Sequence, residues 1–527
     1  MNAVPVESLM RLLKILVSPC LAVIYLSTGC ARDEQFVTPR DIPDDPVRGG
    51  TLSIAIQSDG RSLDPHRVTD AASMRLIENM YGTLMRYSAE YGDVEPYIAE
   101  SYEVSEDHTG YTFKLRPGIR FNRTGRELTS TDVKYSIRRI IENEVRAEHF
   151  AFLDSMDTPD DRTIVFNLAR PMAPFLIYLA HPMNAVVDRD IVEAGGGSLD
   201  NTDAGTGPFR LVEWRRDLRL VMDRNEEYHV DGLPYLDRIV YRPIPDETAR
   251  TTSLRMREID ISLDVPDKDR SILQEVEHVT VESVPGTFWE YVGMNNERAP
   301  FDDKRVRQAV AWSIDRAMAN QLVKLNRSNI LTGGFFPSNH WAYSQMEIFP
   351  ERDTEKALEL LQEAGLPDGF DAVIRVGSAF PYQVAAAQVI KQNLEDVGIM
   401  TEILSEESSV FFDALARGDF DMTVVGWLGF VDPDEWLYNV FHSDGRWNQQ
   451  NYSNPEVDEL LEKGRLTSDR ENRREVYHGA QKKIVRDAPV ALLYINEQTS
   501  AFLDAVQGFR VHPAATTLSL RETWLAR

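Results

Sequence analysis

Carboxylates and tryptophans gather in one short stretch of this sequence, between residues 418 and 443. Two tryptophans enclose three acidic side chains there: Trp427, Asp432, Asp434, Glu435 and Trp436. An apolar run typical of a strand, DMTVVGW, ends where these residues begin. Aromatic faces and carboxylates at the point where regular structure ends are typical of a ligand site. DPD is also ordinary turn and helix-start chemistry, so a helix-capping role for Asp432 is an equal alternative.

Catalytic chemistry has little support in the sequence. The motifs GxSxG, HExxH, GxxxxGKS/T, GxGxxG and CxxC do not occur, and the ten histidines include no close helical pair. A glycan-active enzyme could use Asp432 and Asp434, but it needs carboxyl groups about 5 to 9 Å apart around a sugar. Neighbours in one turn rarely face a ligand atom in that way. We therefore expect that the protein is not an enzyme and that it binds no cofactor and no metal ion.

Length and charge narrow the possible architectures and partners. With 527 residues, the chain exceeds the roughly 250 residues at which a single core stops growing, so at least two lobes are expected. Its formal charge is -27, from 57 Lys and Arg against 84 Asp and Glu. A surface this acidic repels phosphodiesters and anionic lipid head groups, which argues against nucleic acid as a partner.

The first thirty residues resemble an export signal. Arg11 and Lys14 precede an apolar segment of about 15 residues, which is too short to span a bilayer comfortably. We predict a signal peptide over residues 1–29, followed by lipidation at Cys30 as in bacterial lipoproteins. Ser27 departs from the usual lipoprotein processing site, so simple secretion with cleavage nearby is the alternative.

The rest of the chain contains no thiol, because both cysteines lie in or directly after the apolar segment. Disulfides, Cys-ligated zinc, iron-sulfur clusters and a cysteine nucleophile are thereby excluded from the folded body. Residues 30–48 carry three prolines and many charges without an apolar period, which predicts a flexible tether.

The remaining sequence alternates predicted strands and helices. TLSIAI predicts a strand from residue 51, and near-helical spacing predicts an amphipathic helix over residues 71–87. Later, DAVIRVG, QVAAAQVIKQNLEDVG and IMTEILS predict a parallel pair of strands joined by a helix. In open sheets of this kind, ligands lie beyond the carboxyl ends of the strands, where the WLGFVDPDEW loop is expected.

Three ordered segments resemble a known family: GGTLSIAIQSDGRSLDPH, AESYEVSEDHTGYTFKLRPGIRF and TDVKYSI, followed by GTGPF and IVYRPI. They are similar to the family 5 extracellular solute-binding proteins, the dipeptide, oligopeptide and nickel receptors of ABC importers. Two local departures from the family pattern occur. Residues 122–125 stand where family members usually have an HDG-like turn, and Thr131 stands where they usually have an acidic residue. The family implies an α/β fold with two lobes, the type II periplasmic binding protein fold of the cluster C kind, with an extra peripheral subdomain.

That resemblance implies an organisation of the chain. Lobe I is expected over residues 49–290, with its subdomain at about 70–200, lobe II over 291–490, and a return to lobe I over 491–527. Two strands crossing between the lobes would form a hinge that closes over a small solute. We expect a monomer in the periplasm or cell envelope, tethered to the membrane by lipid and delivering solute to an ABC permease and ATPase complex. A sensor or chaperone lipoprotein on the same fold is the alternative.

The resemblance also implies ligand-contacting residues. Peptide receptors of the family carry an aspartate shortly after the GW pair, which binds the amino terminus of the peptide, whereas the matching positions here are Gly429 and Phe430. We therefore expect that short peptides with free amino termini are not preferred. The residues predicted to line the cleft are Gln57, Asp59, Tyr81, Trp427, Phe430 and Asp432. Turn or helix roles are equally open for Gln57, Asp59 and Tyr81.

Overall fold

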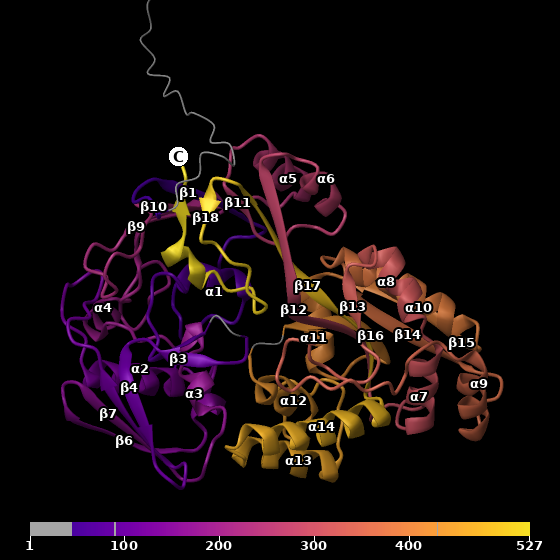
Figure 1. The fold of residues 1–527 in the computed structure, drawn as a ribbon. Helices are drawn as coiled ribbons and strands as arrows, with labels where there is room; N and C mark the ends of the chain where they lie inside the picture. Colours follow the sequence, from indigo (N-terminus) through magenta and orange to yellow (C-terminus); the bar gives the residue numbers. More distant parts are fainter. Residues whose placement is uncertain (1–44, 89–90, 429–430) are drawn as a thin grey trace, which may run out of the picture. The chain divides into compact units, whose positions relative to one another are not determined.

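One large sheet dominates the computed structural model, which describes residues 45–88, 91–428 and 431–527 (Figure 1). Its strands are β1 (Thr51–Ile56), β8 (Phe209–Arg215), β9 (Arg219–Arg224), β10 (Arg238–Pro243), β11 (Ile261–Ser262), β12 (Val279–Met294), β13 (Ser328–Ile330), β14 (Phe370–Gly377), β15 (Ile399–Glu406), β16 (Met422–Leu428) and β17 (Val490–Leu503). They are ordered β15-β14-β16-β12-β17-β11-β1-β10-β9-β8, and β13 pairs with β17. The two-lobed α/β fold predicted from the sequence is confirmed.

The long strands β12 and β17 link the two lobes. They pair antiparallel over most of their length, from Val279 opposite Leu503 to Gly293 opposite Val490 (Figure 1). The pairing shifts register between Pro285 and Trp289. We call the part of the sheet around β1 and β8–β11 lobe I, and the part around β13–β16 lobe II. The predicted pair of crossing strands is confirmed, while the exact residue boundaries of the lobes stay a prediction.

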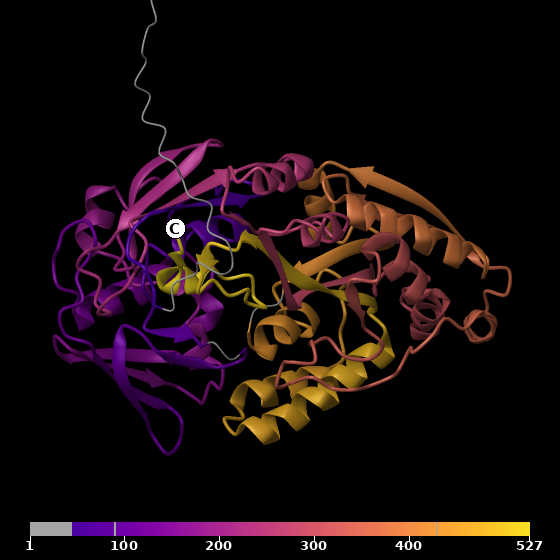
Figure 2. The same ribbon diagram turned by 45° about the horizontal axis from the view of Figure 1, so that its top comes forward.

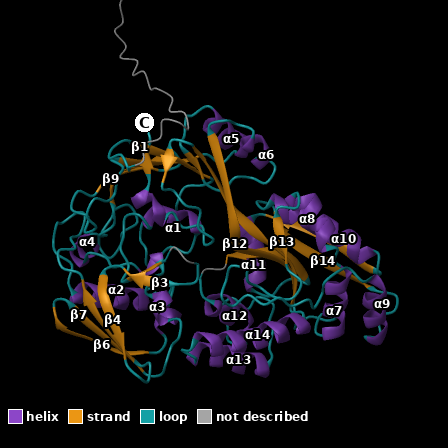
Figure 3. Ribbon diagram, in the orientation of Figure 1, coloured by secondary structure: helices purple, strands orange, loops and turns teal. Residues whose placement is uncertain are grey.

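Lobe II has the predicted parallel arrangement. Strand β14 pairs parallel with β15 and with β16. Helices pack against these strands and beside them (Figure 3). They are α7 (Lys304–Ser313), α8 (Arg316–Lys324), α9 (Thr354–Glu363), α10 (Pro381–Glu395), α11 (Ser408–Ala416), α12 (Pro433–Phe441), α13 (Pro455–Leu466) and α14 (Arg470–Asp487).

A separate four-stranded sheet, in the order β4-β5-β7-β6, forms the peripheral subdomain at the lower left of Figures 1 and 2. Its strands are β4 (Ala99–Val104), β5 (Gly110–Leu115), β6 (Leu153–Asp160) and β7 (Thr163–Leu168). Beside it lie β2 (Met85–Tyr87), β3 (Val94–Pro96), α2 (Ser130–Glu142), α3 (Phe175–Tyr178) and the short 3-10 helices η1 (Ala147–Phe150) and η2 (Pro182–Asn184). The subdomain has its own cluster of buried apolar side chains, distinct from those of the two lobes.

The smaller elements complete lobe I and the C-terminal segment. They are α1 (Ala71–Ile77), α4 (Arg189–Ala194), α5 (Glu247–Arg255), α6 (Arg270–Gln274), η3 (Leu518–Glu522), β18 (Val506–Gln507) and β19 (Trp524–Leu525). No helix within the described ranges is long and apolar enough to cross a bilayer.

Two helix predictions were wrong at their ends. The helix expected over residues 71–87 stops at Ile77, and β2 occupies its last turn. The GTGPF turn packs closely on the segment that follows the helix: a Cβ on Gly205 would lie 2.2 Å from the Met80 carbonyl oxygen. The sequence NPEVDELLEKG predicts a helix that starts after Asn454 and ends before Gly464, but the helix continues through Gly464 to Leu466. That glycine packs against another helix, where its Cβ would meet the Tyr477 ring at 2.8 Å.

Candidate functional site

Asp432, the central candidate of the sequence, is fully buried and begins helix α12. Its side chain accepts a hydrogen bond from the Asp434 amide at 2.9 Å, and Pro433 occupies the first helical position. Both carboxylate oxygens also accept hydrogen bonds from Arg473 of α14, at 2.6 and 2.7 Å. Burial opposes the charge of Arg473, but the attraction of Asp432 raises its pKa. Asp432 is therefore both a helix cap and half of a buried ion pair.

Asp434 is the second buried carboxylate of α12. Arg465 of α13 donates to it at 2.8 and 3.0 Å, and the Tyr178 hydroxyl of α3 makes a short hydrogen bond with it. Burial raises the pKa of Tyr178, and the negative charge of Asp434 raises it further, so this hydroxyl stays a donor. The subdomain is thus hydrogen-bonded directly to lobe II through Asp434.

Glu435 is the third carboxylate, and no arginine pairs with it among the described residues. Its side chain is almost completely buried. One oxygen accepts a long hydrogen bond from the Val431 amide at 3.4 Å, while the other, Oε1, has no hydrogen-bond partner in the described part of the chain. Nε2 of His149 lies 3.9 Å from Oε1. Burial, with a smaller contribution from the charge of Asp432, raises the pKa of Glu435 to about 8.

Aromatic and histidine rings surround Glu435. His149 stacks on Tyr178 with ring centroids 4.0 Å apart, and Tyr87 stacks on His512 at 6.4 Å. The Tyr87 hydroxyl and Nε2 of His512 also lack hydrogen-bond partners within the described ranges. We call these five residues the Glu435 cluster. They come from β2, η1, α3, α12 and the segment after β18, so lobe I, the subdomain and lobe II all contribute.

A second polar cluster is buried on the crossing strands. Lys324 of α8 donates to Glu290 of β12 at 2.7 Å, and Asn496 of β17 donates to the same oxygen at 2.9 Å. The other Glu290 oxygen and the Tyr494 hydroxyl have no hydrogen-bond partner among the residues described. Burial and the charge of Glu290 together raise the pKa of Tyr494. We call Glu290, Lys324, Tyr494 and Asn496 the Glu290 cluster.

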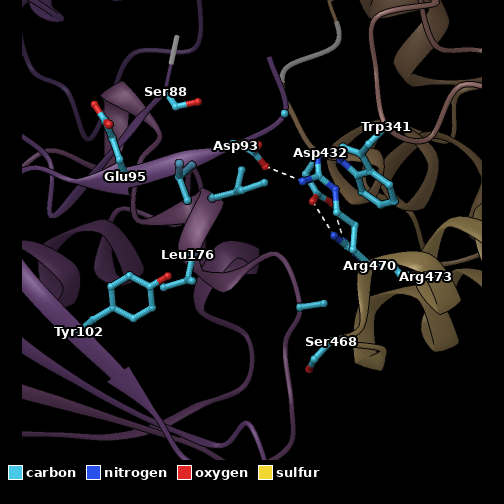
Figure 4. A pocket seen from close by; sticks show the side chains of 14 residues that line it. Ser88, Asp93, Glu95, Tyr102, Leu176, Trp341, Asp432, Ser468, Arg470 and Arg473 are labelled. Carbon is cyan, nitrogen blue, oxygen red and sulfur yellow. Dashed lines mark hydrogen bonds and ion pairs between the residues drawn. The ribbon is translucent and has the colours of Figure 1, made fainter. Parts of the chain in front are cut away.

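A cavity of about 710 Å³ lies between the subdomain and helix α14 (Figure 4). Asp93, beside β3, pairs with Arg470 at 2.7 Å across it. The Arg470 guanidinium also lies 5.4 Å from the centre of the Trp341 ring, and the Asp432–Arg473 pair forms part of the same wall. Leu176 and Tyr102 add apolar surface. The cavity thus combines aromatic, apolar and charged groups at the junction of subdomain and lobe II.

Several buried polar groups of this region could pair with a small molecule. Within the described ranges no group of three or more His, Cys, Asp or Glu side chains could hold a metal ion. Buried polar atoms without partners are rare in folded proteins, and a bound ligand or ordered water usually accounts for them. Here such atoms occur in the Glu290 cluster on the crossing strands and, separately, in the Glu435 cluster.

Comparison with known proteins agrees with this geometry. The family model for bacterial extracellular solute-binding proteins, family 5 (middle part), matches residues 93–449. The chain belongs to this family. As a family 5 solute-binding protein, it is the extracytoplasmic substrate-binding component of an ABC importer.

Several relatives of this family 5 protein have named ligands. Glutathione-binding protein GsiB of Pectobacterium atrosepticum is 27% identical over 474 residues, covering 87% of this chain and 91% of that protein. DppA from Helicobacter pylori, in complex with the peptide STSA, matches with a TM-score of 0.82 at 26% identity, covering 93% of this chain and 99% of that chain. AgaA from A. tumefaciens R10, in complex with agropinic acid, matches with a TM-score of 0.80 at 27% identity. The match covers 90% of this chain and 99% of that chain.

The structure separates the residues that the sequence grouped as ligand contacts. Trp427 is the last residue but one of β16 and is half-buried, and its ring centre lies 5.5 Å from that of Trp447. Phe430 and Cys30 lie outside the described residues. Gln57 is exposed at the end of β1. Together with Asp432, Trp427 lies in lobe II next to the junction, and its contact with solute stays a prediction.

Asp59 and Tyr81 have structural partners. Asp59 accepts hydrogen bonds from the Trp214 indole at 3.0 Å and from the Asp217 amide at 2.8 Å, which fixes a turn. Tyr81 is buried in the core of lobe I, and its hydroxyl donates to the Leu63 carbonyl at 3.0 Å. The turn and core alternatives left open for these two residues describe their local contacts.

Sequence reasoning missed the Glu290 cluster and most of the Glu435 cluster. Glu290 had a usable signal, because it is a single acidic residue inside the apolar strand TFWEYVGM. A charge in such a strand is expected to be paired or functional. Lys324, Tyr87 and His512 carried no comparable signal, since each lies in a mixed polar segment.

Proposed function

We propose that this protein captures a small peptide-like or other amphipathic solute at the junction of the lobes, beside the Glu435 cluster. The observation that supports this proposal is the set of buried polar atoms of that cluster without partners among the described residues: Glu435 Oε1, the Tyr87 hydroxyl and Nε2 of His512. Each costs free energy when left unpaired, so a solute that pairs with them gains binding energy.

The Glu435 cluster offers both an acceptor and a donor to such a solute. Glu435 Oε1 can accept from an amide N–H, while the Tyr87 hydroxyl can donate to a carbonyl or carboxylate. The rings of Tyr87 and Tyr178 supply apolar faces for the solute's carbon skeleton. The relatives named for glutathione and for the peptide STSA support a solute with amide groups.

The expected low preference for peptides with free amino termini stays part of the proposal. Asp432 was the residue that could have replaced the missing loop aspartate. Its two oxygens are instead taken by Arg473 and by the start of α12, which supports the proposal that it offers no free carboxylate to an amino terminus. Nanomolar binding of dipeptides by calorimetry would contradict this part.

We also propose that the mature protein is a lipid-anchored monomer without enzymatic activity. The predicted signal peptide over residues 1–29 and the small residues before Cys30 support the anchor. Metabolic labelling with palmitate, compared between the wild type and Cys30→Ser, tests it. Label that persists in the variant would contradict lipidation at Cys30.

Solute capture is tested with the mature soluble chain. Native mass spectrometry first identifies any co-purified molecule, and scanning fluorimetry then screens this molecule, glutathione and tetrapeptides for stabilisation. For each stabilising solute, calorimetry compares the wild type with Tyr87→Phe and with Glu459→Gln, an exposed residue of α13. We expect an affinity loss of about tenfold for Tyr87→Phe alone, since it removes a buried hydroxyl that pairs with the solute. Equal affinities would contradict the proposed site, and failure of every solute would contradict solute capture.

A further inference from the structure

We propose that Glu435 is a subsite for a cationic amine of the solute, carried on an unbranched chain. This inference rests on the proposed function for the existence of a solute and adds the chemistry of one of its ends. Its starting point is the uneven pairing of the three carboxylates in the first turn of α12.

Charge balance singles out Glu435. Asp432 and Asp434 each pair with one buried arginine, Arg473 and Arg465 respectively. Glu435 is 6% exposed, and the closest cationic candidate is His149 at 3.9 Å. A buried carboxylate without a partner is costly, so the site favours an incoming positive charge.

His149 does not supply that charge. The Asn184 side-chain amide donates to Nδ1 of His149 at 2.9 Å, so the ring carries its proton on Nε2, toward Glu435. Burial and the neighbouring His181 and Arg146 lower the pKa of His149 well below its ordinary value, which keeps the ring neutral. The Arg146 guanidinium donates instead to the Val68 carbonyl at 2.6 and 3.0 Å.

The titratable and charged groups around Glu435 come from every element packed on it: Tyr87, Tyr91, Arg146, His149, Tyr178, Asp432 and Asp434. The tyrosines stay neutral because burial raises their pKa values well above the ordinary value. Their ring faces attract cations, and the Tyr87 hydroxyl adds an acceptor. An ammonium group therefore finds a carboxylate, a hydroxyl and aromatic faces together.

Burial also limits the shape of the amine. Glu435 and Tyr87 are both at least nine-tenths buried, so we expect only a narrow space beside the carboxylate. A primary ammonium on an unbranched alkyl chain fits such a space, whereas the α-amino group of a peptide sits on a branched carbon. The subsite is therefore compatible with a low preference for free peptide amino termini.

Butylammonium is a suitable probe, because it carries the proposed group and does not depend on the identity of the natural solute. We would measure its half-saturating concentration for the full mature chain at pH 8 by scanning fluorimetry and ligand-observed NMR, with sodium chloride matching the ionic strength. The proteins are the wild type, Glu435→Gln and the control Glu459→Gln. We expect Glu435→Gln to raise this concentration about tenfold or more, since it removes a charge-assisted hydrogen bond, and Glu459→Gln to leave it unchanged.

Three results would overturn the proposal: no binding of butylammonium to the wild type, equal binding to Glu435→Gln, or equal binding of the branched tert-butylammonium ion. Circular dichroism confirms that each variant is folded. If peptide-like solutes still bind while butylammonium does not, the amine subsite fails and solute capture stands.

The pH dependence gives an independent readout. Free Glu435, with a pKa of about 8, is mostly protonated at pH 6 and must lose its proton to pair with an ammonium group. The affinity for butylammonium should therefore rise between pH 6 and 8 by up to about tenfold per pH unit. Glu435→Gln should abolish this rise, and a pH-independent wild type would contradict the proposal.

Discussion

Replacing Asp432 by Asn separates its structural role from a role in solute binding. Asn is as good a helix cap as Asp, so the start of α12 is expected to survive. The substitution removes the charge that faces Arg473, whose side chain is 6% exposed. The variant thus leaves a buried guanidinium without its counterion.

The size of the stability loss in Asp432→Asn follows from the burial of the ion pair. Removing one partner of a buried ion pair costs about 3–5 kcal/mol, because the remaining charge stays out of water. Loss of the negative charge at the start of α12 adds about 0.3–1 kcal/mol through the helix dipole. We therefore expect the free energy of unfolding to fall by about 3–6 kcal/mol. In the double variant Asp432→Asn with Arg473→Met, no unpaired charge is left, and most of the loss should be recovered.

Urea unfolding at 25 °C, followed by fluorescence and circular dichroism, measures the free energy of unfolding of the wild type, of Asp432→Asn and of the double variant. The lobe II core is expected to lose stability even if the chain does not unfold in a single step. Calorimetry with any solute found for the wild type should give an affinity within about threefold of wild type for the folded variant. A stability change below about 1 kcal/mol, combined with a large loss of affinity, would show that Asp432 acts on the solute and that the structural reasoning is wrong.

Three further predictions address other buried groups. Glu290→Gln should lower the free energy of unfolding by about 3–5 kcal/mol by isolating Lys324, and urea midpoints close to wild type would contradict this. Burial raises the pKa of Glu435 to about 8 and of Glu78 to about 7, so the folded chain keeps protons that the unfolded chain loses above about pH 4.5. Stability should therefore fall from pH 5 to 7, and Glu435→Gln should reduce that slope by about 1.4 kcal/mol per pH unit in urea titrations; an unchanged slope would argue against the raised pKa. Gly207→Ala should destabilise by about 1–3 kcal/mol because its Cβ would lie 2.5 Å from a backbone carbon, and a wild-type melting temperature would contradict it.

The fold was largely predictable because its signals are local. Apolar residues at every second position predicted strands β14 and β15, and apolar residues at helical spacing predicted α10. The β-α-β order then predicted the parallel pairing of the two strands, which the structure has. Asp and Asn favour the position before a helix, and Asp353 and Asn454 do cap the starts of α9 and α13. Gly464 misled because a glycine that stops a helix and a glycine that admits a neighbouring ring look the same in sequence. The ring of Tyr477 that decides between them belongs to the next helix.

The site was less predictable because its decisive contacts are distant in sequence. The stretch DPDE presents three carboxylates that local pattern cannot distinguish. Arg465 lies 31 residues after Asp434, and Arg473 lies 41 residues after Asp432. Only the packing of α13 and α14 on α12 shows which two carboxylates those arginines neutralise.

The same packing explains why a carboxylate next to two ion pairs is suited to binding. Arg465 and Arg473 hold Asp434 and Asp432 in place, so the first turn of α12 is fixed before any solute arrives. Glu435 is presented from that rigid turn, and the negative charges beside it raise its pKa beyond what burial alone would do. A preorganised acceptor loses little freedom on binding, and its unfavourable ionisation is relieved only when a cation enters. The two structural aspartates would therefore contribute to recognition indirectly, by making Glu435 the one carboxylate of the turn whose charge still has to be balanced.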